Sequence, residues 1–235
     1  MTTSGSTVFS LTRDQIITAA VRKLGRLASG QSLTAQQITD GAQGLNSLIA
    51  YFQTLGMPLW ARTETTFALT LSTATYTIGS GLTINTPAPL KLYQAFSVVD
   101  SVGIEMEIVS KFANTNSILA TDGSRPVQIT YQPKVDTGLI TIWPSPDATA
   151  VADVTVRIIY QRPVEMFTAT SETMDIPKEW HLPIVYNLAV LLAPEWGVPL
   201  ADRTALQKEA NEYLTRTLEF GQEDGSVYFS ARQEM

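Results

Sequence analysis

The sequence predicts an α+β protein in which both ends of the chain form a helical bundle domain and the middle forms an inserted antiparallel β domain. Apolar residues recur with helical spacing up to residue 55 and again from residue 175, and they alternate with polar residues in between. About six to eight short strands with no long helix between them are typical of a β-sandwich or a barrel. The expected domains are residues 1–61 with 166–220 (helical), residues 62–165 (β), and a tail, residues 221–235.

Two capping boxes mark the starts of the first two predicted helices. In each box a threonine precedes the helix and a glutamine follows three residues later, as Thr12 with Gln15 and Thr34 with Gln37. The threonine oxygen can accept a hydrogen bond from a backbone N–H of the first turn, and the glutamine can return one. The two helices should pair as an antiparallel hairpin that ends near Gly56. Their predicted core residues are Ile17, Val21, Leu24, Leu45, Leu48, Phe52 and Trp60.

The middle of the chain changes from a helical period to the two-residue period of strands. Turns at Asp100–Gly103 and Lys134–Gly138 should each close a hairpin, and residues 111–119 should hold one short helix. The segments expected to form strands are 66–71, 76–78, 93–99, 104–109, 127–131, 139–143 and 154–161.

A strongly apolar stretch follows and should be the centre of the helical domain. The ten residues Ile184–Ala193 contain only one plainly polar side chain, Asn187. A bilayer-spanning helix needs about twenty residues, so a helix this short and apolar should lie in a core. Asp175 should cap it, Pro177 should occupy its first turn, Pro183 should kink it and Pro194 should end it. Its predicted core residues are Trp180, Leu188 and Leu191, and a last helix should run over residues 200–220.

The composition limits the classes of function. Only 16% of the 235 residues are charged and 44% are hydrophobic, so we expect partners to cover much of the surface. The net charge of −6 argues against a protein that wraps nucleic acid. The chain has no cysteine, which excludes disulfides and thiolate metal sites. It shows no signal segment and no membrane-spanning run, so we expect it to fold in a cytosol.

Candidate catalytic and ligand-binding residues are few. His181 is the only histidine, and a zinc site around it would need three carboxylates, so a structural histidine is expected. Gly79-Ser80-Gly81 lacks the pattern around a catalytic serine and is interpreted as a hairpin turn. Glu105 and Glu107 should share one face of a strand, where a solvated position is more common than glycosidase chemistry. We therefore predict no catalytic, metal-binding or cofactor-binding residue.

Four tryptophans offer a second kind of candidate site. Trp60, Trp143, Trp180 and Trp196 could form a sugar-binding platform, although buried anchors in cores and interfaces are their more common use. An exposed aromatic platform on the β domain would favour a carbohydrate-binding module, and buried aromatic residues would count against one. A hydrolase that uses Glu105 and Glu107 is a third and weaker alternative.

Several motifs, in their order and spacing, resemble one known family. The resemblance covers about half of the chain, in its two helical portions. It rests on the segments Leu11–Ile17, Ala20–Gly25, Leu45–Phe52, Gly56–Trp60, Tyr160–Pro163, Asp175–Trp180, Asn187–Ala189 and Ala193–Gly197. Together they are similar to head-to-tail adaptor proteins, also called connector or head completion proteins, of short-tailed, podovirus-type phages.

The resemblance implies a virion structural protein and no enzyme. Such adaptors form a ring, usually a dodecamer, that docks beneath the portal protein at the capsid vertex. They extend the DNA channel, help to retain packaged DNA and attach the tail nozzle or fibres. The chain should therefore assemble in the cytoplasm of the bacterial host, reside at the portal vertex, and let DNA pass without sequence-specific binding or any contact with a membrane.

Two further expectations rest on this resemblance. Val227, Tyr228 and Phe229 form an aromatic cluster in the tail, and we expect the tail to become ordered on the portal protein. Twelve copies of a chain with a net charge of −6 would carry about −72, which would repel DNA from the channel wall if the acidic residues line it.

Overall fold

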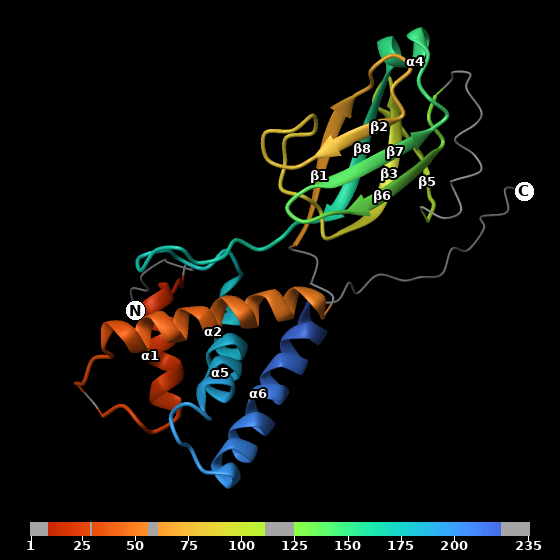
Figure 1. Cartoon of the computed structure of the whole chain (residues 1–235). Helices are drawn as coiled ribbons and strands as arrows, with labels where there is room; N and C mark the ends of the chain where they lie inside the picture. The colour runs from red at the N-terminus through yellow and green to blue at the C-terminus, as the bar shows by residue number, and fades with distance from the viewer. Residues whose placement is uncertain (1–8, 29, 56–60, 111–124, 222–235) are drawn as a thin grey trace, which may run out of the picture. The chain divides into compact units, whose positions relative to one another are not determined.

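The structure of the chain is a computed structural model, and it describes residues 9–28, 30–55, 61–110 and 125–221 (Figure 1). Within these ranges it contains five α-helices and eight strands, so the predicted α+β class is confirmed. The chain divides into two compact units. One, which we call the helical unit, comprises Met1–Leu59 and Val164–Met235, and the other, which we call the β unit, comprises Trp60–Pro163.

The helical unit is organised around helix α5, which contacts each of the other three long helices of the unit. The two predicted capping boxes are present at the starts of α1 and α2. The side chains of Gln15 and Gln37 each accept a hydrogen bond of 2.9 Å from the backbone N–H of Thr12 and Thr34, respectively. The helices are α1 Arg13–Lys23, α2 Ala35–Thr54, α5 His181–Leu192 and α6 Leu200–Phe220, with a 3₁₀ helix, η2 Lys178–Trp180, directly before α5.

Helix α5 begins later than the sequence predicts. It starts at His181, and neither it nor η2 is capped by a side chain, so the expected cap at Asp175 is wrong. Pro183 therefore lies in the first turn of α5, where a backbone N–H has no helical partner to lose, and not at an interior kink. The helix is also not buried on all sides, because Leu182 and Leu191 are each 45% exposed.

Two glycines of α2 allow the other helices to pack closely against it. A Cβ atom at Gly41 would lie 2.5 Å from the Cγ2 atom of Ile17 in α1, closer than carbon atoms approach each other. A Cβ atom at Gly44 would lie 3.2 Å from the Cδ2 atom of Leu192 in α5, which is tight but tolerable. The two positions are three residues apart and so lie on neighbouring parts of one helix face. The helix contacts therefore depend on the missing side chain at Gly41.

We expect Gly41→Ala to destabilise the helical unit although alanine favours helices. The gain in helix propensity is about 1 kcal/mol, whereas overpacking a core costs about 1–3 kcal/mol. Ile17 is fully buried and β-branched, so its side chain cannot easily turn away. Gly44→Ala is the matched control and should change stability little, because the end of the Leu192 side chain can move. Urea denaturation followed by the helical circular dichroism signal measures both, and a Gly41→Ala protein as stable as wild type would contradict the packing.

The segment that follows the β unit is held along α2 by side-chain amides. The side chain of Asn46 donates to the carbonyl of Phe167 at 3.0 Å and accepts from its N–H at 3.1 Å. A few residues later in the segment, the carboxylate of Glu172 accepts hydrogen bonds from Thr168 and Ala169. These bonds lower the pKa of Glu172, and the bond from the Ala169 N–H has the largest effect. These bonds position the segment ahead of η2 and α5.

Two four-stranded sheets face each other in the β unit, across one shared core (Figure 1). The first sheet has the order β1-β8-β3-β4 and is antiparallel throughout, whereas the second has the order β2-β7-β6-β5, in which only β5 and β6 are parallel. Both sheets have free ends, so the alternative of a closed barrel is wrong. The strands are β1 Arg62–Ala68, β2 Thr75–Ile78, β3 Lys91–Val99, β4 Val102–Glu105, β5 Glu107–Ile108, β6 Gln128–Pro133, β7 Gly138–Trp143 and β8 Val154–Gln161.

The first hairpin differs from its prediction in two respects. Its turn contains only Asp100 and Ser101, which both have positive φ angles of 47° and 69°, typical of a tight two-residue turn. The predicted single strand 104–109 is in fact two strands in different sheets. β4 pairs with β3 in the first sheet, the chain crosses at the buried Met106, and β5 pairs with β6 in the second.

One helix of the β unit is not among the predicted elements. Helix α4, Ala148–Asp153, precedes β8, and the side chain of Asp147 caps it by accepting a 2.7 Å bond from the N–H of Ala150. The predicted helix at residues 111–119 lies outside the described residues. The Gly79-Ser80-Gly81 segment forms a turn after β2, as expected, but the chain then makes only a single bridge at Ile84 and no second strand.

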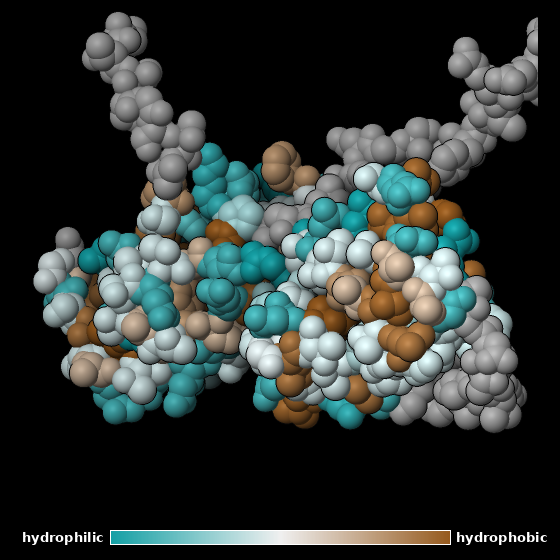
Figure 2. Space-filling model, turned by 90° about the horizontal axis from the view of Figure 1, so that it is seen from above, coloured by the Kyte–Doolittle hydropathy of each residue, from teal (hydrophilic) through white to brown (hydrophobic). Residues whose placement is uncertain are grey.

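The described surface is unevenly apolar. Figure 2 shows hydrophobic residues interrupting the pale and polar surface of the β unit. Aromatic residues contribute to the exposed set only in the helical unit, as Phe9, Tyr51 and Phe220. In the β unit the exposed large apolar residues of the described chain are all aliphatic: Leu71, Leu82, Leu90, Val102, Ile104, Ile108, Val127 and Val135.

Candidate functional site

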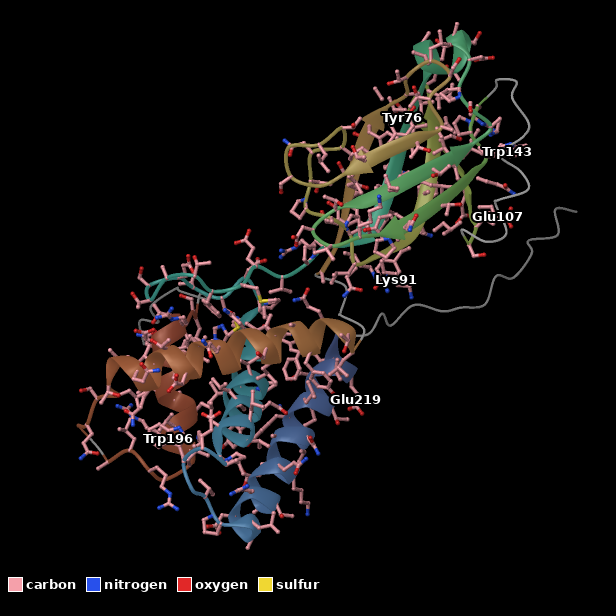
Figure 3. The ribbon with its side chains drawn as sticks, in the orientation of Figure 1. Tyr76, Lys91, Glu107, Trp143, Trp196 and Glu219 are labelled. Atoms are coloured by element: carbon pink, nitrogen blue, oxygen red, sulfur yellow. The ribbon has the colours of Figure 1, made fainter. Side chains whose placement is uncertain are left out.

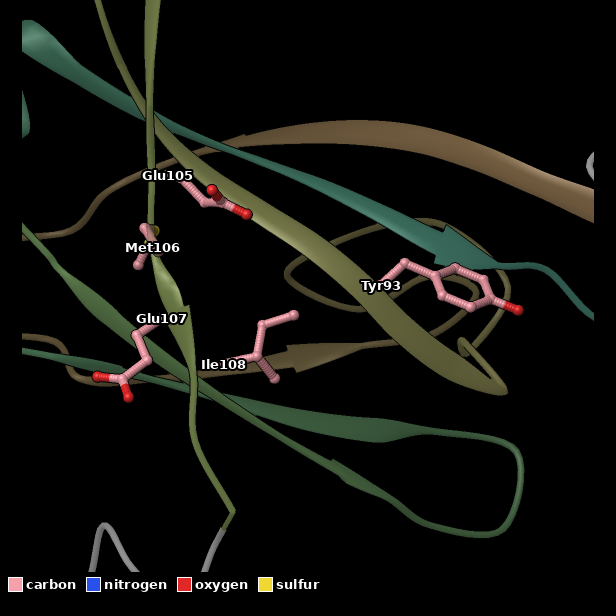
Figure 4. Close-up of a pocket in the computed structure, with 5 residues that line it drawn as sticks. All are labelled: Tyr93, Glu105, Met106, Glu107 and Ile108. Atoms are coloured by element: carbon pink, nitrogen blue, oxygen red, sulfur yellow. The ribbon is translucent and has the colours of Figure 1, made fainter. Parts of the chain in front are cut away.

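Glu105 and Glu107 do not form a carboxylate pair on one strand face, so that expectation is wrong. Glu105 ends β4 opposite Phe96 in the first sheet, and Glu107 begins β5 opposite Gln128 in the second. The carboxylate of Glu107 accepts a 2.9 Å bond from the Gln128 side chain. Figure 4 shows the two glutamates on either side of Met106, at an open hollow of about 440 Å³. Both residues are exposed, and they belong to strands of different sheets.

His181 is placed as a structural residue. Its side chain is buried at the start of α5, 5.3 Å from the ring of Phe9 between centroids. Burial lowers the pKa of His181, and the nearby Glu179 only partly opposes this effect. The ring is therefore uncharged at neutral pH, and its Nδ1 atom has no hydrogen-bond partner among the described residues. Within the described ranges no three His, Cys, Asp or Glu side chains come together as metal ligands do.

The aromatic residues of the β unit do not form an exposed platform. Tyr76 lies between the sheets and is 2% exposed (Figure 3). Trp143 is half-buried at the end of β7, where it is the cross-strand neighbour of Gln128, which in turn pairs with Glu107 of β5. No aromatic side chain in the described part of the β unit is classed as exposed. Trp180 is buried in the helical unit, Trp196 is half-buried in the loop after α5, and Trp60 lies outside the described residues. This arrangement counts against a sugar-binding surface.

Most of the residues named as the helical core are buried. Leu188 is fully buried in α5, and Phe52 packs against Trp180 with 6.1 Å between ring centroids. Leu191 is the exception at 45% exposed and lies outside the core. Trp60 and the tail cluster Val227, Tyr228 and Phe229 lie outside the described residues. The others, each at most 9% exposed, are Ile17, Val21, Leu24, Leu45 and Leu48.

In the described part of the β unit, one side leaves apolar side chains of the core exposed, and the sequence did not single it out. Here β4 ends the first sheet and β5 ends the second, joined through Met106. Val102 is 62% exposed, Ile104 39% and Ile108 40%. The strand partners of Ile104 and Ile108, which are Ser97 and Ile129, are buried, and the partner of Val102, Val99, is partly buried. We call the strands β4 and β5 with these three apolar side chains the open rim. The alternation of apolar residues at 102, 104, 106 and 108 predicts an inward face but gives no sign that these side chains are exposed among the described residues.

In the described chain, no helix has the length and hydrophobicity needed to cross a bilayer. Comparison with family models finds a match to the model described as SU10 adaptor protein, over residues 11–232. No curated protein matches the chain.

Proposed function

The chain belongs to the SU10 adaptor protein family, and we propose that it forms the head-to-tail adaptor ring of a tailed-phage virion. Membership makes it a phage structural adaptor protein and confirms the resemblance to head-to-tail adaptors. The match over residues 11–232 is the observation that carries the proposal, because it includes both helical segments and the β unit between them. The ring would be a dodecamer that docks beneath the portal, continues the DNA channel, and attaches the nozzle or fibres of the tail.

The same proposal assigns a role to each part of the chain. The predicted helical domain, residues 1–61 with 166–220, would form the adaptor domain, and the inserted β domain, residues 62–165, would contact neighbouring copies and tail proteins. The protein would act by binding and not by catalysis. Assembly would take place in the cytoplasm of the bacterial host before the completed virion is released. The acidic composition of the chain supports a channel wall that repels DNA, and a ring whose lumen is lined by Arg and Lys would contradict that wall.

The C-terminal tail, residues 221–235, is proposed to dock on the portal through Val227, Tyr228 and Phe229. A polar and charged segment with one apolar cluster, Val227–Phe229, suits a tail that becomes ordered when it binds. A chain that ends at Phe220 should therefore fold normally but fail to join portal-containing heads. Joining is measured by cosedimentation of purified chain with heads that lack it.

A full-length chain with alanine at Val227, Tyr228 and Phe229 provides the matched control for length. It should fail in the same way if the aromatic cluster makes the contact, and it should bind if only the length of the tail matters. Normal joining by the truncated chain would exclude the tail as a docking element. Failure of the wild-type chain to join any portal-containing head would instead contradict the adaptor function.

A further inference from the structure

The two sides of the β unit differ in how well they close its core. At the side formed by β1 and β2, the inward-facing residues are covered: Phe67 is 8% exposed, Tyr76 2% and Ile78 0%. At the open rim, the corresponding residues Ile104 and Ile108 are about two-fifths exposed. An exposed apolar edge of this kind is an aggregation hazard that native proteins usually block with proline, lysine or a covering element. Neither β4 nor β1 contains proline or lysine, and their only charged residues are Glu105 in β4 and Arg62 and Glu64 in β1.

Strand β4 also presents unpaired backbone groups at this rim. The N–H of Met106 donates to the carbonyl of Ala95 at 2.8 Å, and antiparallel bonds alternate along a strand, so Ile104 also bonds toward β3. The N–H and C=O groups of Gly103 and Glu105 therefore point away from β3. No strand in the described chain pairs with them, because β4 is the last strand of its sheet. An extended segment from another molecule can thus add to this edge.

The opposite edge of the same sheet fits this requirement. Continuous cross-strand registers place Glu105 level with Phe96, then Arg157, then Thr66 of β1, and they place Gly103 level with Ala68. Backbone hydrogen bonds alternate between the two sides of each strand, and this alternation can be followed from β4 through β3 and β8 to β1. It shows that the backbone N–H and C=O groups of Thr66 and Ala68 point away from β8, just as those of Glu105 and Gly103 point away from β3. The four strands alternate in direction, so β4 and β1 run antiparallel. A second copy placed beside the first would therefore continue the sheet with matching direction and matching hydrogen-bond groups.

We propose that β4 of one copy pairs with β1 of the neighbouring copy, so that the first sheet continues from subunit to subunit around the ring. This inference rests on the proposed ring and names the surface that holds it together. The pairing is head-to-tail and uses two different edges, which is the kind of contact that generates closed rings. It would bring Ile104 next to Phe67 of the neighbouring copy on the core side of the sheet and cover the open rim. If the two copies lie level with each other, Glu105 of one copy faces Thr66 of the next and not the carboxylate of Glu64.

Cysteine cross-linking tests the pairing directly, because the natural chain contains no cysteine. Glu105 and Thr66 are exposed, and paired antiparallel strands hold such residues about 5.5 Å apart, within reach of a disulfide. The double variant Glu105→Cys, Thr66→Cys should form a ladder of covalent multimers in assembled rings on mild oxidation. Each single variant should remain monomeric on a denaturing gel. Dimers of Glu105→Cys alone would show a two-fold β4–β4 contact and overturn the proposal.

A charge placed on the edge gives a second test with a matched control. Val102→Lys puts lysine on β4, whereas Val135→Lys makes the same change at an 88% exposed position in the β6–β7 turn. We expect Val102→Lys to leave a folded chain whose assembly needs at least tenfold more protein, and Val135→Lys to assemble as wild type. If the double cysteine variant forms normal rings but no cross-link, the β4–β1 pairing is wrong, while the proposed ring still stands. Absence of rings from the wild-type chain would contradict the proposed function itself.

Discussion

Replacing Leu188 by aspartate should unfold the helical unit. Leu188 is fully buried in α5, the helix that contacts α1, α2 and α6. An aspartate there would place an unpaired charge in the core, one of the few changes that cost more than about 4–5 kcal/mol. That cost is close to the whole stability of many domains, which is about 5–15 kcal/mol. Circular dichroism and limited proteolysis of the purified chain measure the loss of helical structure.

Leu191→Asp makes the same chemical change three residues later in the same helix. Leu191 is 45% exposed, so the carboxylate stays in water and the expected cost is about 1 kcal/mol. Part of this cost comes from a negative charge near the C-terminal end of the helix, where the helix dipole disfavours it. A folded Leu188→Asp protein that still assembles would show that α5 is not the centre of this core.

The second large effect is expected at Gly138 in the β unit. A Cβ atom there would lie 2.5 Å from Cε2 of Tyr131 and 2.9 Å from Cγ2 of the fully buried Ile78. The ring of Tyr131 cannot turn away freely, because its hydroxyl donates a hydrogen bond to the carbonyl of Pro89. Gly138→Ala should therefore cost about 2–3 kcal/mol through overpacking. Burial of this hydroxyl also raises the pKa of Tyr131 to about 12.

Gly103→Ala is the control for this prediction, since it is also a glycine in a strand. Its new Cβ atom would lie 3.1 Å from the terminal Nη2 atom of Arg157 and 3.6 Å from two atoms of Phe96, which is ordinary contact, so only the end of a long side chain has to move. Thermal unfolding of the two variants at a concentration too low for assembly separates their effects. Equal unfolding temperatures for Gly138→Ala and wild type would show that the turn between β6 and β7 has room for a methyl group.

Local signals in the sequence predicted local structure well. The pairs Thr12 with Gln15 and Thr34 with Gln37 predicted two helix starts, because a capping box involves only residues within one turn. Helix α4 carried a similar signal in Asp147, but six residues are too few to establish a helical period. Leu191 was misplaced because a helix that is apolar on every side has no periodicity to show which side faces water.

The features that depend on distant parts of the chain were not predictable. Residues 104–109 alternate as one strand would, yet Met106 marks a crossing between sheets, which is decided by the pairing of β4 with β3 and of β5 with β6. The open rim has the same origin. The sequence predicts that Ile104 and Ile108 face inward, but only the packed sheets show that nothing in the described chain covers them.

The most direct test of the adaptor function is negative-stain electron microscopy of the purified chain with and without portal protein. We expect rings of the chain stacked on one end of the portal, with a continuous central channel. Wild-type protein that stays monomeric and unbound at saturating portal concentration would contradict the adaptor function.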